Sequence, residues 1–208
     1  MACLELEKIY YKQGNFVLHD INFSVEEGEL VALSGRTGSG KSTLIRLIGQ
    51  AEHPDVGRIL YYGKEMYEDE RNIRKLMSVM YHEPNFNTEI LAGKLPLYLK
   101  KIEPDFDLEL FHEMMQYLHL REKKKIADYS AGTKKKYMLI LALCRNPKLL
   151  VLDEPTSGID DASRREVWKL LLAYRKDHQA TILFSTHHED ELEELGARRL
   201  ILEKGGLR

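Results

Sequence analysis

The chain has 208 residues, which is enough to bury one full hydrophobic core, so we expect a single domain. Its 31 basic and 33 acidic residues leave a formal charge of -2, which excludes a surface-wide attraction to nucleic acid or to an anionic membrane. Two cysteines, Cys3 and Cys144, provide no disulfide framework and suit a reducing compartment.

The apolar stretches are short. The sequence is charged from Glu5 onward, so we expect no secretory signal at its start. The longest apolar run, YMLILALC at 137–144, is far shorter than the roughly 20 residues that a membrane-spanning helix needs. We therefore do not expect this chain to enter a membrane alone.

Two stretches near the N-terminus alternate apolar with polar residues, which is typical of half-exposed strands. They are LELEKIY at 4–10 and INFSV at 21–25, and they lie on either side of Gly14 and Asn15. We expect them to form an antiparallel β flap.

Further along the chain the apolar runs become continuous, and helical stretches separate them. The three runs are ELVALS (29–34), LLVLDE (149–154) and TILFST (181–186). Continuous runs of this kind indicate parallel strands that are covered on both faces, so the predicted fold class is α/β with a mainly parallel sheet.

Between the first and second of these runs, the stretch from 84 to 129 has a helical pattern. In DLELFHEMMQYLHL (107–120), apolar residues recur at helical spacing with no strand nearby. We interpret 84–129 as an inserted α-helical lobe, and 1–83 with 130–208 as the core that surrounds it.

A glycine-rich segment, GRTGSGKST, follows the apolar strand at 29–34 and opens an apolar helical stretch. Its glycines permit consecutive N–H groups to converge on phosphate oxygens at a helix N-terminus. Lys41 is expected to reach the β- and γ-phosphates and Ser42 to bind Mg²⁺. An ordinary glycine turn is the alternative. The predicted nucleotide-binding residues are Gly35, Arg36, Thr37, Gly38, Ser39, Gly40, Lys41, Ser42 and Thr43.

The segment LLVLDEP places two acids at the end of a buried strand. If the strand geometry persists, Asp153 and Glu154 point to opposite sides and have separate roles. Asp153 is expected to hold Mg²⁺ through its water shell, and Glu154 to orient or deprotonate a water. We expect Pro155 to end the strand. Taken alone this pattern is weak, because acids commonly mark the solvent end of a strand.

The segment YSAGTKKKYMLILALC (129–144) puts three lysines where a helix should begin. A helix N-terminus carries a partial positive charge, so Lys134, Lys135 and Lys136 lie at the electrostatically less favourable end.

Five motifs in this order resemble the nucleotide-binding subunit of an ATP-binding-cassette (ABC) transporter, over essentially the whole chain. They are GRTGSGKST, LLVLDEP, SGID (157–160), YSAGT (129–133) in the place of the family signature, and His187 in FSTHH as the switch histidine. The resemblance implies a P-loop NTPase core of RecA-like type, with ATP and Mg²⁺ as ligands. The catalytic residues would be Glu154, His187 and Lys41.

In this family two subunits pack head to tail, and the signature of one covers the nucleotide bound to the other. The resemblance therefore implies that Asp160 communicates between the two sites. It also implies that the three lysines either face a bound triphosphate or form a solvated face. The signature residues that would act in trans are Ser130, Ala131, Gly132 and Thr133.

The resemblance also assigns residues around the rest of the nucleotide. Tyr11 is expected to stack on adenine, with Tyr10 as the alternative. His187 would bind the γ-phosphate, while His188 should point elsewhere. His82 in VMYHEPNF stands where the family has glutamine, and it would accept from Mg²⁺-bound water or be an exposed loop residue.

Three signature positions depart from the usual family sequence: Tyr129 replaces leucine, Ala131 replaces glycine and Thr133 replaces glutamine. Together with His82, these changes predict slower or pH-sensitive coupling.

The function implied by the resemblance is ATP hydrolysis that powers export of a lipid, peptide or drug-like substrate. The partners would be a second ATPase subunit, in a homodimer or heterodimer, and a separate transmembrane subunit at the cytoplasmic face of the membrane, without nucleic acid. Small bacterial exporter subunits are the most similar type. The alternatives are an ATPase that drives a cell-division or mechanotransmission partner, a soluble ABC ATPase, and a low-turnover nucleotide sensor.

Overall fold

The computed structural model of the protein describes residues 1–208, apart from the side chain of residue 189. A smaller sheet is antiparallel and contains strands β1 (Ala2–Gln13), β2 (Phe16–Glu26), β4 (Val56–Tyr61) and β5 (Lys64–Glu65). Its strand order is β2-β1-β4-β5, and β1 and β2 form the hairpin predicted around residues 14 and 15. The antiparallel flap is thus confirmed, with longer strands than the sequence indicated.

The larger sheet has the order β10-β9-β3-β8-β7-β6, and all of its pairs are parallel except that between β9 and β10. Its strands are β3 (Leu30–Ser34), β6 (Met77–Met80), β7 (Leu149–Asp153), β8 (Thr181–Thr186), β9 (Arg198–Glu203) and β10 (Gly206–Leu207). The α/β class with a mainly parallel sheet is confirmed.

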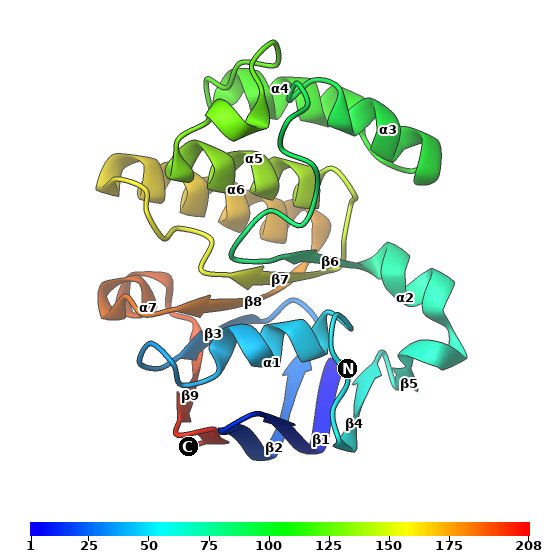
Figure 1. Cartoon of the computed structure of the whole chain (residues 1–208), viewed down its shortest axis with the longest axis vertical. Helices are drawn as coiled ribbons and strands as arrows, with labels where there is room; N and C mark the ends of the chain where they lie inside the picture. The colour runs from blue at the N-terminus through cyan, green and yellow to red at the C-terminus, as the bar shows by residue number, and fades with distance from the viewer.

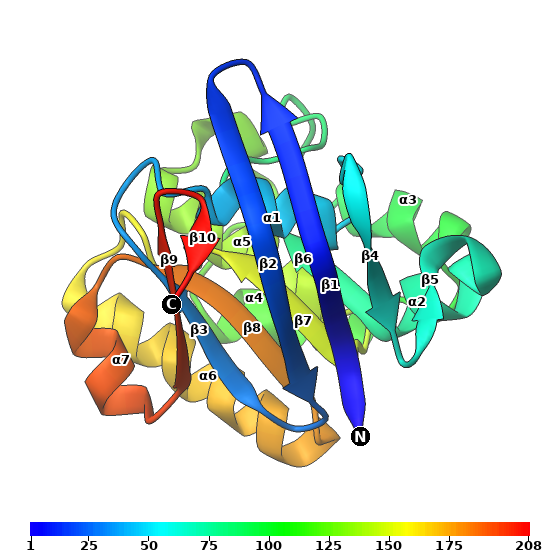
Figure 2. The same ribbon diagram turned by 90° about the horizontal axis from the view of Figure 1, so that it is seen from below.

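Both faces of the larger sheet are covered. Helix α1 (Lys41–Ile48) lies between the two sheets, as Figures 1 and 2 show. Along β3, Val31 and Leu33 join a core with α1 and the smaller sheet, whereas Ala32 joins the core on the opposite face. Because side chains alternate along a strand, the continuous apolar run serves both cores.

The opposite face is covered by a layer formed by α5 (Ala131–Leu143) and α6 (Asp161–His178), and α3 (Leu95–Ile102) and α4 (Leu108–Tyr117) lie beyond it (Figure 1). The remaining helices are α2 (Glu70–Leu76) and α7 (Glu189–Leu195), and the 3-10 turns are η1 (Met66–Glu68) and η2 (Ile126–Asp128). Among the described helices, none combines the length and apolarity needed to cross a membrane.

The segment 84–129 carries α3, α4 and η2, so it is helical as expected. Its buried residues, among them Phe106 and Phe111, belong to the same apolar cluster as Leu150 of β7. The lobe and the sheet therefore share one core through α5, and the division into 1–83 with 130–208 and 84–129 stays a prediction.

One buried aromatic side chain joins the lobe to α5. The ring of Tyr137 lies edge-on to Phe86, Phe111 and Tyr129, with centroids 5.9 to 6.2 Å apart. Its hydroxyl donates to the carbonyl of Ala92 at 2.8 Å. Edge-to-face rings contribute beyond their buried area, so this residue ties three segments together.

We expect Tyr137→Ala to lower the free energy of unfolding by about 3–5 kcal/mol, because it leaves a cavity among three rings. Tyr137→Phe removes only the bond to the Ala92 carbonyl and should cost about 1 kcal/mol. Urea unfolding followed by circular dichroism measures both. Equal costs for the two variants would contradict the packing role of the ring.

Candidate active site

The glycine-rich loop, the two acids and His187 meet at one edge of the larger sheet. The ends of β3 and β8 are in register, with Ser34 opposite Thr186, and Asp153 of β7 is opposite Ser185. Because these strands are parallel, the segments that follow them emerge at the same edge. The glycine-rich loop, Glu154 and His187 are therefore brought together, which is where open α/β sheets bind ligands.

The glycine-rich loop has the backbone that its sequence predicts. Gly38 and Gly40 have φ values of 79° and 110°, in the left-handed region that other residues rarely adopt. A Cβ on Gly40 would lie 2.5 Å from Cζ of Phe16. The hydroxyl of Ser39 is buried without a hydrogen-bond partner among the described side chains, and the loop thus keeps a free polar group for a ligand.

Lys41 starts α1 and its ammonium turns back over the loop. Nζ donates to the carbonyl of Gly35 at 2.8 Å and to that of Arg36 at 3.4 Å. The ammonium is therefore held within the loop that is expected to bind phosphate.

A pocket of about 240 Å³ opens over this loop and reaches Glu154. Its lining residues are Phe16, Thr37, Gly38, Gly40, Lys41, Ser42, Thr43 and Glu154. Six of the nine predicted loop residues and one of the two acids thus line a single pocket, while Gly35, Arg36 and Ser39 are absent from its lining.

The aromatic residue at this pocket is Phe16 and not Tyr11. Tyr11 does not line the pocket, and the nearby Glu52 carboxylate raises the pKa of its hydroxyl. Tyr10 is exposed and is also absent from the lining. The hairpin bend at residues 14 and 15 explains the difference, because it carries the first residue of β2 to the loop.

The two acids of the second motif differ in burial and partners. Asp153 is buried, and its Oδ1 accepts from the hydroxyl of Ser185 at 2.6 Å. The same hydroxyl oxygen accepts from the backbone N–H of Glu154 at 2.9 Å. Ser185 therefore fixes both acids, a role that the sequence did not indicate.

The strand does not extend through both acids, contrary to the expectation. It ends at Asp153, and Glu154 has a φ of 48°, in the left-handed region. The separate directions of the two carboxylates therefore come from this turn and not from strand alternation. Pro155 lies beyond the end of the strand and does not terminate it. Strained backbone of this kind occurs at functional sites.

Two histidines flank the carboxylate of Glu154. His187 Nδ1 lies 3.3 Å from Oε1, and His82 Nε2 lies 3.7 Å from Oε2. His82 is half-exposed but close to the acid, so the alternative of an uninvolved loop residue is disfavoured. The ring of His188 packs against that of His187 with centroids 4.2 Å apart, and His188 does not line the pocket over the loop, so its direction away from the phosphates stays a prediction.

The signature segment forms the start of α5. Ser130 is the N-cap, and its Oγ accepts from the backbone N–H of Thr133 at 3.2 Å. A Cβ on Gly132 would lie 2.6 Å from Ile159 Cγ2, so glycine is needed for this close approach. None of 130–133 lines the pocket over the glycine-rich loop of the same chain.

Asp160 caps α6 in the same way. Its Oδ1 accepts from the backbone N–H of Ser163 at 2.9 Å, and this hydrogen bond lowers the pKa of the carboxyl. A capping role is visible here, while communication between two sites stays a prediction.

The three lysines do not form one face. Lys135 is buried and donates to the carbonyl of His82, and Lys136 donates to Ser163 Oγ at 2.9 Å. Lys134 is partly exposed. Both expectations for the run, a solvated face and a face toward a second nucleotide, are therefore wrong for Lys135 and Lys136, whose ammonium groups bind within the chain.

A family model described as "ABC transporter" matches residues 18–157, which is most of the chain. The chain belongs to the ABC transporter family. Its fold is also that of a solved structure described as the ATP-binding subunit of an ABC transporter, with a TM-score of 0.82 and 26% identity over 99% of this chain and 88% of that one. It is thus an ABC ATPase by family and fold.

Relatives differ in what they transport. The ABC transporter ATP-binding protein YtrB of Bacillus subtilis is 34% identical over 93% of this chain and 66% of that protein. The glucosylceramide transporter ABCA12 of Homo sapiens is 33% identical over 97% of this chain but 8% of that protein. The methionine import ATP-binding protein MetN 2 of Bacillus cereus is 30% identical over 96% of this chain and 62% of that protein. The chain thus spans less than two thirds of each of these relatives.

A further residue that the motifs did not reveal is Glu191 in α7. It is only 3% exposed, and its carboxylate accepts from the hydroxyl of Thr156, from Trp168 Nε1 and from the hydroxyl of Thr186. The same Thr186 hydroxyl oxygen accepts from the N–H of His188. Glu191 therefore joins the segment after the acids to the switch segment of the ABC ATPase. Its spacing of four from Leu195 on a helix was the available signal.

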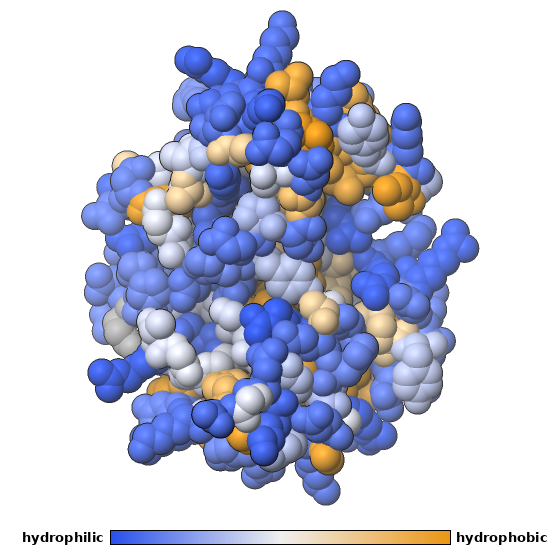
Figure 3. Space-filling model, viewed as in Figure 1, coloured by the Kyte–Doolittle hydropathy of each residue, from blue (hydrophilic) through white to orange (hydrophobic). Residues whose placement is uncertain are grey.

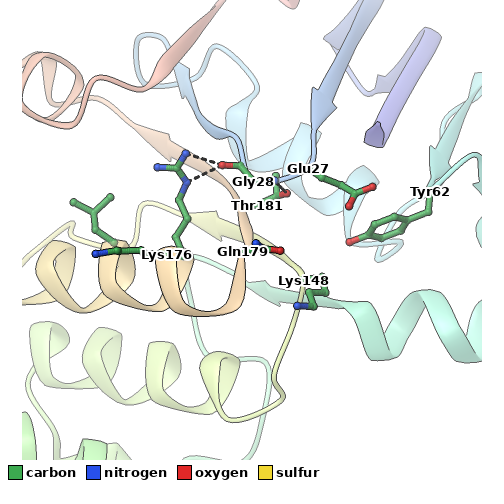
Figure 4. Close-up of a pocket in the computed structure, with 9 residues that line it drawn as sticks. Glu27, Gly28, Tyr62, Lys148, Lys176, Gln179 and Thr181 are labelled. Carbon is green, nitrogen blue, oxygen red and sulfur yellow. Dashed lines mark hydrogen bonds between the residues drawn. The ribbon is translucent and has the colours of Figure 1, made fainter.

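A pocket of about 580 Å³ lies at the opposite edge of the sheet (Figure 4). It is bordered by Gly28, whose carbonyl accepts two bonds from Arg175, and by the first residue of β8, Thr181. No predicted site residue lines this pocket. The active site is therefore assigned to the smaller pocket over the glycine-rich loop, which is lined by Lys41, Ser42 and Glu154.

We expect Phe16→Ala to weaken MgATP binding about five- to tenfold, because the ring is the aromatic surface available to a base at the pocket. Tyr11→Ala should change the affinity less than twofold. Calorimetric titration of the two purified variants gives the comparison, with their melting temperatures as a control for folding. The reverse order would restore Tyr11 as the base-stacking residue.

Proposed function

We propose that this chain hydrolyses ATP and that the reaction powers an ABC transporter through a separate transmembrane subunit. The observation that carries the proposal is that Glu154 lines the same pocket as the glycine-rich loop and lies beside His187. An acid in this position can accept a proton from a water next to a bound γ-phosphate.

The residues fit a bound nucleotide. The loop from residue 35 to 43 supplies N–H groups and the Lys41 ammonium for the phosphates. Ser42 and Asp153 would hold Mg²⁺, because this cation uses one or two protein oxygens together with substrate phosphates. When bound, Mg²⁺ would neutralise charge on the β- and γ-phosphates. Among the described side chains there is no cluster of three or more acids, histidines or cysteines that could hold a metal by itself.

In the proposed reaction the water oxygen attacks the γ-phosphorus while the bond to the bridging oxygen breaks. The proton of the water passes to Glu154, and ADP and phosphate are released. His187 would bind the γ-phosphate and keep the carboxylate in place. His82, on the other side of the carboxylate, would contact water bound to Mg²⁺.

The site is completed by a second ATPase subunit in the proposed mechanism. In a head-to-tail dimer, Ser130 and Gly132 of the second copy would cover the γ-phosphate with the N-terminus of their helix. Ala131 and Thr133 stand at the remaining signature positions, and Asp160 would connect the two sites. The exposure of Ser130 at the start of α5 supports this arrangement.

The transmembrane subunit would dock on the helical lobe. Apolar side chains of α3 are exposed there, and Figure 3 shows a hydrophobic patch over this helix. The exposed residues are Leu97, Tyr98 and Ile102. A groove beside them is lined by Phe86, Leu95 and Leu99, and it leads to the loop that carries His82. Motion of that loop would thus pass to the membrane partner.

We propose export of a lipid or other amphipathic molecule. The support is a relative named as a glucosylceramide transporter, although another relative is named as a methionine importer.

A low-turnover nucleotide sensor is the second candidate, because His82 replaces the usual glutamine and Ala131 and Thr133 replace usual signature residues.

The test compares wild-type protein with Glu154→Gln. We expect the wild type to hydrolyse MgATP and the variant to lose at least about 100-fold in turnover, because its amide cannot accept the proton. The variant should also elute as a dimer in size-exclusion chromatography with MgATP and as a monomer without it.

His53→Gln serves as the matched control, since it exchanges an exposed side chain remote from the pocket over the loop. A wild type that binds ATP but neither hydrolyses it nor dimerises would contradict the transporter mechanism and favour the nucleotide sensor.

A further inference from the structure

The middle lysine of the run at the start of α5 points into the protein. Lys135 is 7% exposed, and its Nζ donates to the backbone carbonyl of His82 at 2.7 Å. Lysine is rarely buried to this degree without a partner that compensates for lost water. The bond crosses 53 residues of sequence, so it joins two segments that the chain does not otherwise connect locally.

The surroundings of this ammonium include the acids of the active site. Burial lowers the pKa of Lys135, and the carboxylates of Asp153, Glu154 and Glu83 act in the opposite direction. The lysine thus donates a hydrogen bond to the loop around residue 82, while the charges of Asp153 and Glu154, and of Glu83 on the loop itself, favour its ammonium form. His82, which departs from the usual family sequence, and the lysine run therefore meet at one point.

Lys135 lies on the same helix as the signature residue Ser130, so a movement of the helix start also moves this hydrogen bond. Ser130 caps the helix and Lys135 lies five residues later, about 7.5 Å further along the axis. A helix over this distance moves as a unit, because its backbone hydrogen bonds hold it together. Any shift of the helix start is therefore carried to the carbonyl of His82, whose ring lies 3.7 Å from Glu154.

We propose that Lys135 is a positioning residue that couples the signature end of α5 to the loop holding His82 beside Glu154 in the same subunit. The inference rests on the proposed two-subunit mechanism. When Ser130 engages the nucleotide of a second copy, the helix displaces the loop, and the nearby base responds. Binding of nucleotide in one subunit thereby changes the position of His82 beside Glu154 in the other subunit.

The comparison with the neighbouring lysine supports this role. Lys136 donates to Ser163 and lies 3.4 Å from the Glu166 carboxylate, so it joins α5 to α6 and not to the loop. Adjacent lysines on one helix turn thus make hydrogen bonds to two different segments. Only the bond from Lys135 leads to the active-site loop.

The first experiment measures the loop directly. Cys3 and Cys144 are fully buried, so Asn85→Cys, at an exposed position of the loop, can be labelled selectively with a nitroxide. We expect Lys135→Met to increase the mobility of this label in the absence of nucleotide. Lys148→Met is the matched control, because that lysine makes an equivalent 2.7 Å bond to the carbonyl of His178 at the opposite edge of the sheet.

The second experiment measures turnover. We expect Lys135→Met to lower kcat about tenfold with KM for ATP changed less than twofold, because the phosphate loop is untouched. Lys135→Arg keeps a cationic donor and should retain kcat within about threefold of wild type. Lys148→Met should behave as wild type in both measurements.

The third experiment tests the coupling itself. In the Glu154→Gln background, MgATP should change the mobility of the label at position 85, and the added Lys135→Met should abolish this response. The proposal is overturned if Lys135→Met leaves the label mobility unchanged, if it raises KM without lowering kcat, or if Lys135→Arg fails as severely as Lys135→Met. A wild type without ATPase activity would instead overturn the proposed function, while the nucleotide-free label would still show whether Lys135 holds the loop.

Discussion

The parallel pairing of β3, β7 and β8 is the constraint on which the whole site depends. Because the three strands run in one direction, the glycine-rich loop, the two acids and the switch histidine leave the sheet at the same edge. The sheet can persist only if both of its faces are covered, which α1 and the smaller sheet do on one side and α5 and α6 on the other. Among these covering elements, α1 begins at the site itself.

Small polar contacts refine what the sheet arranges. Ser185 holds both Asp153 and the backbone of Glu154 through one hydroxyl group. Glu191 accepts from Thr156, which follows the two acids, and from Thr186, which ends β8. Lys135 donates to the loop that carries His82. Each of these bonds lies in a largely buried region, where an unpaired polar group is costly. The backbone of Glu154 and the loop beside its carboxylate are therefore both positioned by hydrogen bonds from other segments.

The fold class and the motif residues could be predicted from the sequence because their signals are local. Continuous apolar runs indicated the parallel strands, and the spacing of Gly35, Gly38, Gly40 and Lys41 indicated the phosphate loop. Phe16 was missed because its place over the loop depends on how the hairpin bends. The turn at Glu154 was missed because the sequence pattern of a strand does not reveal a left-handed residue at its end.

Lys135 and Glu191 were missed for a different reason. A charged residue on a helix is normally assigned to the solvent-exposed face. Only tertiary contacts show that the side chains of Lys135 and Glu191 are buried and hydrogen-bonded to other segments. A weak signal existed, since Lys135 shares a helix face with Met138 and Leu139, both buried. The dimer and the membrane partner lie beyond a single chain, so their surfaces stay proposals.

The network around Glu191 also gives the protein an optical property. Trp168 is the single tryptophan of the chain, and its indole N–H donates to the Glu191 carboxylate at 3.1 Å. The same carboxylate binds Thr186, which ends the strand leading to the switch histidine. The tryptophan fluorescence of the molecule therefore originates from one buried indole, which is hydrogen-bonded to the carboxylate that holds the switch segment. Changes in that segment have an intrinsic spectroscopic reporter that needs no added dye.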